Sequence, residues 1–505
     1  MKLIERLENR IAPVTAEGED ADPKQRGATL ILATLVLVTL MGMAGFAVDL
    51  GWLYLKTTEA QKAAEASALA GVVHMPYPAS VPFAASEAHD TAIDVAARNG
   101  YTSGSGTTVT PQPVAGRPNR LNVQVATTAP TFFMKVFGLD SVSFMRDATA
   151  EQLPPLKLGS DEPYLGSDPT DPTRNRFFFV AINGEREPKE NGDPFSTRCV
   201  AACSSGTPNP QYIDPAYYYA VEVPDSEVGQ SMNIQIYDGP HWRNNQSNFL
   251  AGNPLATGDR ADPPSGFALR FTLFAPDQTP GNPADNPAIP GCSRTYGEAS
   301  SGTSAGVREW TSVCTVTATK GLYVLAVSID GNGRAISDFS IRTLVGGNQN
   351  SGVDVYGLGA MSLDMIQAGV TANFKIVKLE DIYAGTQLVI SLFDPGDISG
   401  GFANLSFDGE AAAWDCGVRI YNHAKNPITG WTGDDSPGSA PCLLNTSGQR
   451  FNNQWVEFRF DIPSTYTCAI DCWLRVTYNF APTATVTERT TWGARINGQP
   501  IHLLP

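Results

Sequence analysis

The chain of 505 residues has little charge and little histidine. Charged residues make up 17% of the sequence, five histidines are present, and the formal net charge is −16. No cluster of lysines and arginines occurs, so the chain lacks the cationic surface that releases counterions from a nucleic acid. We therefore expect no nucleic-acid partner.

The sequence also lacks the short motifs of the common enzymes. No nucleophile elbow, P-loop, dinucleotide fingerprint or HExxH pattern is present, and the histidines stand apart from any motif acid or serine. Asp394 and Asp397, together with Asp238, form only a weak pattern for calcium. We therefore expect no enzymatic activity, no cofactor and no metal.

Long apolar runs are absent, with one exception. Residues 28–48 contain no charged residue, and about 20 apolar residues cross the ~30 Å hydrocarbon core of a bilayer as a helix. Lys24 and Arg26 precede the run, which weakly favours a cytoplasmic N-terminus. The long polar segment before the run argues against the alternative, a cleaved signal peptide. We expect a cytoplasmic tail at 1–27, a single transmembrane helix at 28–48 in the cytoplasmic membrane, and an extracytoplasmic remainder.

Cysteine is absent from the first 198 residues. An even number confined to the rest of the chain is typical of disulfides in an oxidising compartment, whereas buried free thiols in a cytosolic protein are the alternative. The eight cysteines are Cys199, Cys203, Cys292, Cys314, Cys416, Cys442, Cys468 and Cys472.

A carboxylate and two aromatic residues follow the apolar run directly. Trp52 and Tyr54 fit the aromatic belt of a membrane interface. Asp49 costs free energy at this depth unless its carboxylate reaches the interface or a partner. We expect Asp49 either to reach the interface beside Trp52 or to pair with a cationic group of a partner subunit.

Helix-forming residues continue beyond the run and carry a stripe of mostly small side chains. The stripe consists of Leu50, Leu53, Thr57, Ala60, Ala64, Ser67 and Gly71. Small residues let another backbone approach closely, so the stripe packs either against a partner helix or against the protein's own next domain. With a second helix over 84–98 and short strands after it, residues 49–152 are predicted to form a helical stalk and a small α+β module. The Pro/Gly/Asp-rich stretch 153–172 is predicted to be a linker.

From residue 173 onward, short alternating runs rich in β-branched and aromatic residues are separated by Gly, Pro, Asn and Asp. This pattern is typical of β-sandwiches. Residues 218–238 align without gaps with residues 374–394 at an offset of 156. The fold expected after the helix and module is therefore a mainly β region of two related β-sandwich domains, at 173–346 and 352–505.

The repeat also orders the cysteines. RFTLF, which starts at Arg270, and VRIY, which starts at Val418, each precede a Pro/Gly-rich loop that ends in a cysteine. The repeat predicts four disulfides: two that each close a small loop, and two that each join a long loop to a strand. The predicted pairs are Cys199–Cys203, Cys468–Cys472, Cys292–Cys314 and Cys416–Cys442.

Three segments near the apolar run resemble a known family. They are Arg26-Gly27 before the run, Gly45–Asp49 at its end, and Gln61–Gly71 after it; TFFMKVFG, at 131–138, and Asp147–Ala150 extend the likeness. Residues 26–72 resemble the N-terminal domain of TadG-like proteins of Flp (Tad) pilus assembly. The resemblance implies an envelope protein with an ectodomain outside the cytoplasmic membrane. The Asp-x-Ser-x-Ser metal motif that many relatives carry is absent here.

These observations predict a single-pass, non-enzymatic envelope protein that acts in assembly, anchoring or surface presentation of a Tad pilus. Other Tad components are expected to bind through the small-residue helix face. One alternative is a pilus-independent adhesin or carbohydrate-binding protein that uses Trp242 or Trp431. Another is a secreted hydrolase without a recognisable motif.

Overall fold

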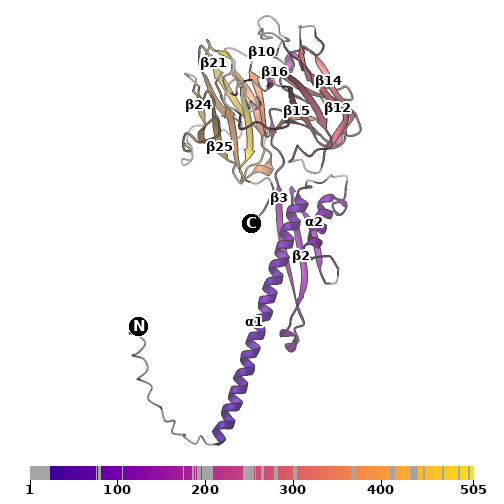
Figure 1. The fold of residues 1–505 in the computed structure, drawn as a ribbon, viewed down its shortest axis with the longest axis vertical. Helices are drawn as coiled ribbons and strands as arrows, with labels where there is room; N and C mark the ends of the chain where they lie inside the picture. Colours follow the sequence, from indigo (N-terminus) through magenta and orange to yellow (C-terminus); the bar gives the residue numbers. More distant parts are fainter. Residues whose placement is uncertain are drawn as a thin grey trace, which may run out of the picture.

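In the computed structural model a long helix carries a small module, and a large β-rich head lies beyond it (Figure 1). The structure describes residues 23–504 except 76, 78–80, 105, 175, 185–186, 188, 190–194, 196–208, 243–254, 256, 263–266, 278–281, 300–303, 332, 366–370, 397, 410–413, 415, 433–441, 447–449, 469–470, 487–488 and 499–500. We call residues 49–152 with 501–503 the stalk module, and residues 157–496 the head.

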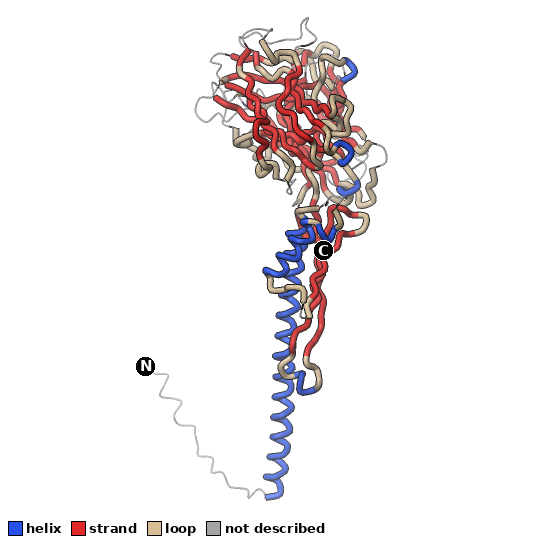
Figure 2. The backbone as a smooth tube through the Cα atoms, turned by 90° about the vertical axis from the view of Figure 1, so that its right-hand side faces the viewer, coloured by secondary structure: helices blue, strands red, loops and turns tan. Residues whose placement is uncertain are grey.

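Helix α1 (Pro23–Val72) is continuous through the apolar run and the first part of the stalk module. Its large apolar side chains between Leu30 and Leu50 are mostly exposed, and the hairpin of the stalk module reaches only the end of this segment (Figure 2). Among the described residues, α1 is the one helix long and apolar enough to cross a membrane by length and composition. At 1.5 Å per residue, the 28–48 segment is about 30 Å long.

The stalk module packs α1 and α2 (Glu87–Arg98) against a four-stranded antiparallel sheet of order β1-β2-β3-β29. Helix α2 begins where Ser86 accepts a hydrogen bond from the amide of His89, and it ends before Gly100, whose φ is +91°. These are the capping signals that the sequence shows. A short 3₁₀ helix, η1 (Phe83–Ala85), precedes α2. The strands are β1 (Thr108–Val114), β2 (Arg117–Pro130), β3 (Ser141–Gln152) and β29 (Ile501–Leu503).

Two expected boundaries differ from the structure. Ile501 pairs with Gln152 on β3, so residues 501–503 belong to the stalk module and not to the second β domain. The expected linker at 153–172 instead contributes strands β4 (Lys157–Leu158) and β5 (Tyr164–Leu165) to the head. These strands are too short to show an alternating pattern, so only the turns between them are visible in the sequence.

Two large sheets form the head. The 11-stranded sheet has the order β14 (Trp310–Thr317), β8 (Ser231–Tyr237), β16 (Arg334–Val345), β6 (Phe178–Asn183), β18 (Ala360–Met365), β28 (Arg489–Ile496), β20 (Gln387–Phe393), β25 (Gln454–Asp461), β23 (Cys416–Asn422), with β10 (Arg260–Asp262) and β5 beside β16. The 10-stranded sheet has the order β12 (Ala288–Tyr296), β11 (Phe267–Phe274), β15 (Gly321–Gly331), β7 (Tyr217–Val223), β17 (Asp354–Leu358), β4, β19 (Thr371–Lys378), β26 (Trp473–Phe480), β22 (Ala403–Asp408), β24 (Leu443–Asn445).

Short pairs and turns complete the head. Strand β9 (His241–Trp242) pairs with β13 (Glu298–Ala299), and β21 (Ile398–Ser399) pairs with β27 (Thr485–Val486). The 3₁₀ turns are η3 (Pro172–Arg174), η6 (Asp225–Glu227) and η7 (Asp381–Tyr383).

The internal repeat is visible in these elements. Strands β8 and β20, and turns η6 and η7, lie at the offset of 156 residues, and Asp238 and Asp394 both adopt a positive φ. The two halves are joined edge to edge: β6 pairs with β18 in one sheet, and β17 and β4 lie between β7 and β19 in the other. The mainly β prediction is confirmed, and the two expected sandwiches share both sheets and one continuous core.

Disulfides close both ends of this double sandwich. Cys292 on β12 is bonded to Cys314 on β14, the outer strands of the two sheets at one end. Cys416 on β23 is bonded to Cys442, which precedes β24, at the other end. These pairs coincide with the expected ones, and Cys199 and Cys203 lie outside the described residues. The expected match of RFTLF with VRIY is wrong, because β11 and β23 lie in different sheets.

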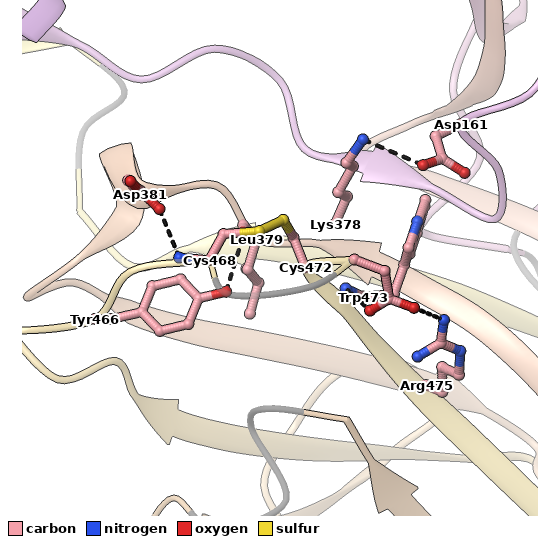
Figure 3. The surroundings of a disulfide bond; sticks show 10 residues. Asp161, Lys378, Leu379, Asp381, Tyr466, Cys468, Cys472, Trp473 and Arg475 are labelled. Carbon is pink, nitrogen blue, oxygen red and sulfur yellow. Dashed lines mark hydrogen bonds and ion pairs between the residues drawn. A yellow bond between two sulfur atoms is a disulfide. The ribbon is translucent and has the colours of Figure 1, made fainter.

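The third disulfide joins Cys468 to Cys472, in the loop between β25 and β26 (Figure 3). The amide of Cys468 donates to Asp381 Oδ1 at 2.6 Å, and the hydroxyl of Tyr466 donates to the carbonyl of Leu379 at 2.9 Å. The small loop is therefore tied to the turn η7, at the end of the head that faces the stalk module.

Candidate functional site

The side chain of Asp49 joins α1 to the far end of the β2–β3 hairpin. Its carboxylate accepts backbone hydrogen bonds from Phe132 at 2.8 Å, Phe133 at 2.9 Å and Met134 at 2.6 Å. These amides begin the 3₁₀ turn η2 (Met134–Phe137), and the first amides of a helical turn have no partner within it. Asp49 thus acts as a capping residue supplied by a different helix.

Close packing reinforces this junction. A Cβ atom on Gly45 would lie 2.7 Å from Phe133 Cγ, so the absence of a side chain lets the hairpin lie directly on α1. The Phe46 and Phe137 rings stack at 5.5 Å, and the Trp52 and Phe132 rings meet edge to face at 5.6 Å.

The hairpin that provides these contacts runs along α1 for the length of the stalk module (Figure 2). At its end, the amide of Thr131 donates to the carbonyl of Asp140 at 3.0 Å, and the Thr131 hydroxyl donates to the carbonyl of Leu139. Gly138 follows η2 with a φ of +87°, which turns the chain back into β3.

The structure corrects the expectation for Asp49. Its carboxylate is buried and is used by the protein's own hairpin, so it neither extends to the interface nor waits for a partner's cation. Trp52 joins the same contact, whereas Tyr54 points away and is 75% exposed. Sequence reasoning missed the donors because backbone amides leave no trace in residue type.

The small-residue stripe also has an internal partner. Ala60, Ala64, Ser67 and Gly71 are all buried in the stalk module. A Cβ on Gly71 would lie 2.5 Å from Leu121 Cδ2 and 2.7 Å from a backbone oxygen of α2. Between Ala60 and Gly71 the face is therefore filled by the protein's own α2 and sheet and is not open to Tad components, whereas Leu50, at the start of the stripe, is 59% exposed.

The hairpin end exposes large apolar side chains beside the bare part of α1. We call this set the tip patch; its members and exposed fractions are Phe132 47%, Phe133 50%, Val136 79%, Phe137 67% and Leu139 53%. On α1, the side chains of Phe46, Val48 and Leu50 are exposed to a similar fraction. The patch is contiguous with the apolar helix surface through the Phe46–Phe137 stack.

The head contains two adjacent buried carboxyl groups, Asp338 and Asp364. Asp338 on β16 is fully buried; burial and the adjacent Asp364 carboxyl raise the pKa of Asp338 well above its usual value. Arg489 donates to Asp364 at 2.9 Å. Within the described ranges, no group of three or more His, Cys, Asp or Glu residues could hold a metal ion.

The weak calcium pattern is only partly described. Asp238 accepts from the amide of Arg308 at 2.8 Å and from the hydroxyl of Thr257 at 2.7 Å, which are turn-stabilising contacts. Asp394 has the same positive φ in the second repeat, and Asp397 lies outside the described residues.

The two tryptophans of the adhesin alternative are not brought together as a binding surface by any described contact. Trp431 is half-buried, with the Arg459 guanidinium 4.5 Å and the Arg419 guanidinium 5.9 Å from its ring centroid. Trp242 belongs to β9, and its side chain lies outside the described part of the structure.

Comparison with known proteins assigns the N-terminal part to a family. Residues 27–75 match the family described as "Putative Flp pilus-assembly TadE/G-like". The match covers the apolar run, Asp49 and the small-residue stripe. No curated protein matches the chain at a significant level.

One solved structure is a remote match to the chain. A chain in the crystal structure of the infectious bursal disease virus VP2 subviral particle is 11% identical in sequence, with 70% of this chain and 80% of that chain covered and a TM-score of 0.12. At this score the likeness carries no argument about fold or function.

Proposed function

We propose that the protein is a single-pass envelope protein that holds its head outside the cytoplasmic membrane and acts in Tad pilus assembly, anchoring or surface presentation. The carrying observation is the TadE/G-like match over residues 27–75, which coincides with α1 and its junction with the stalk module. The exposed apolar surface of α1 supports the membrane anchor, and the disulfides of the head support an oxidising compartment.

The role in pilus assembly is tested by deleting the gene in its Tad-bearing host. We expect surface pilin, recovered by shearing, to be lost on deletion and restored by the full chain. A complementing chain that lacks residues 157–496 separates anchoring from presentation, because it retains the family-matched segment. Unchanged piliation in the deletion strain would reject the role in assembly.

The anchor and its orientation are tested separately. Full chain should stay in the membrane pellet after alkaline carbonate extraction, and a periplasm-active phosphatase fused after the last residue should be active. A reporter that functions only in the cytoplasm should be inactive at the same position. Activity of that reporter would show that the topology is the reverse of the one proposed.

We also propose that the protein is non-enzymatic. Its support is the sequence, which offers no catalytic motif. Turnover of a panel of ester, glycoside and peptide substrates by purified full chain would overturn this part of the proposal.

A further inference from the structure

We propose that the tip patch is immersed in the outer leaflet of the membrane, so that the protein touches the bilayer at two places: through α1 and through the end of its β2–β3 hairpin. This inference rests on the proposed membrane anchor. It adds a lipid-binding surface on the stalk module and assigns to Asp49 the task of holding that surface against the helix.

The level of the patch on α1 gives the first argument. The apolar run ends at Val48, and Asp49 receives the first amides of η2. Phe137 stacks on Phe46 and Phe133 lies against Gly45, three and four residues earlier on α1. At 1.5 Å per residue, the patch extends about 5 Å beyond Asp49 into the level of the apolar run. This is comparable to the ~5–10 Å depth of interfacial helices.

The backbone of the hairpin end gives the second argument. A non-helical segment can enter hydrocarbon only if its polar groups are satisfied within the protein. The amides of residues 132–134 donate to Asp49, and those of 131, 136, 138 and 139 donate to carbonyls within the same turn. This dense internal pairing is what immersion requires and what a water-exposed loop does not need.

The composition of the patch favours lipid over a protein partner. Five large apolar side chains, each 47–79% exposed, surround a single exposed cation, Lys135. A lysine on a flexible stem can carry its ammonium to the phosphate level while its neighbours remain in the acyl region. The patch is also continuous with the exposed apolar surface of α1, so one lipid environment covers both.

A second point of immersion restricts the orientation of the head. A lone transmembrane helix can tilt and rotate within the bilayer at low cost. With the tip patch immersed beside α1, rotation about the helix axis leaves the patch at the same depth, whereas tilt away from the hairpin side lifts it into water. The head is therefore held with one preferred inclination to the membrane.

The test uses the full chain reconstituted in phosphatidylcholine/phosphatidylglycerol vesicles that contain a lipid with a photoactivatable diazirine in its acyl chain. Trypsin then releases residues 27–56 from α1 and, from the hairpin, residues 121–135 and 136–146, which together contain the tip patch. We expect lipid adducts on 27–56 and on the hairpin peptides. The matched variants are Val136→Asp, in the patch, and Met145→Asp, on β3; both native side chains are exposed, at 79% and 53%.

We expect Val136→Asp to lower labelling of residues 121–146 by about threefold or more, because a carboxylate resists entry into hydrocarbon. Met145→Asp should leave labelling unchanged, since Met145 lies further along β3 from the hairpin end. Adducts on 27–56 without adducts on 121–146 would overturn the inference and leave the anchor standing. Absence of adducts on all of these peptides would overturn both the inference and the anchor. Replacement of the lipid adducts by crosslinks to one protein in native membranes would identify a protein interface and also overturn the inference.

Discussion

The packing of α1 in the stalk module can be tested with one substitution on its small-residue face. The effect of this substitution on stability has one sign if the face is open and the opposite sign if the face is filled. Replacing Gly71 by alanine adds one methyl group on the small-residue face. In an open helix, Gly→Ala stabilises by about 0.8–1 kcal/mol through helix propensity. If the face is available to a partner, Gly71→Ala should therefore make the isolated protein more stable.

The structure predicts the opposite. The new Cβ would lie 2.5 Å from Leu121 Cδ2, 2.7 Å from the Ala88 carbonyl oxygen and 3.0 Å from Ala92 Cβ. Overpacking of this kind costs about 1–3 kcal/mol. After subtraction of the propensity gain, we expect a net loss of about 1 kcal/mol in local stability.

The matched control is Gly51→Ala on the same helix. No atom lies within 4 Å of the Cβ that would be added there, so this change should stabilise by up to about 1 kcal/mol. Hydrogen exchange on the detergent-solubilised full chain reads both variants. A loss of 1 kcal/mol corresponds to about fivefold faster exchange of α2 amides in Gly71→Ala. Slower exchange in Gly71→Ala, as in the control, would refute the internal packing of this face and restore a partner helix as its occupant.

Three further predictions concern the disulfides, Asp49 and Asp161. Replacing Cys292 and Cys314 by alanine, with a sequence separation of 22, should cost about 3 kcal/mol in denaturant unfolding, whereas the same change at Cys468 and Cys472, with a separation of 4, should cost about 2 kcal/mol; equal costs would contradict the loop-closure argument. Asp49→Asn should speed hydrogen exchange at the amides of residues 132–134, and unchanged exchange would show that the carboxylate does not hold the hairpin. Partial burial of Asp161 acts to raise its pKa, but hydrogen bonds from Lys375 and Trp473 and the charge of Lys375 outweigh this and hold the pKa at about 2, below the usual 3.8. Because the folded pKa is the lower one, the stabilisation is present above pH 3.8 and is lost as the pH falls towards 2, so the melting-temperature difference between the native chain and Asp161→Asn should vanish over that interval.

Local signals in the sequence located the elements that depend on local chemistry. The apolar run at 28–48 lies within α1, and the helix expected over 84–98 corresponds to α2, which starts later, at Glu87, and ends as expected at Arg98, before Gly100. The repeat at an offset of 156 also transferred to the structure, because β8 and β20 occupy equivalent places in the 11-stranded sheet. For the two helices, the residues that decide the outcome are near neighbours in the sequence.

Contacts between distant residues were missed. Phe132 lies 83 residues from Asp49, and it binds through its backbone, which any residue type could supply. The pairing of β29 with β3 joins segments about 350 residues apart, and three residues carry too little pattern to predict it. Composition predicts a linker at 153–172 because it reports the turns there, whereas Leu158 and Leu165 are fully buried in the head.

The pairing of β29 with β3 makes the connection between head and stalk module double. The chain leaves the module at the end of β3 and returns beside it through β29, and Tyr383 donates its hydroxyl to the Pro154 carbonyl at 3.1 Å across the same junction. Two parallel connections resist rotation of the head, which a single flexible linker would permit. Strand β3 begins next to the tip patch and ends beneath the head, so it spans the module as one extended segment of about 40 Å. Strand β3 is therefore held to α1 at both ends, by the stalk-module core beneath the head and by Asp49 at the hairpin end. The proposed lipid contact lies at the hairpin end.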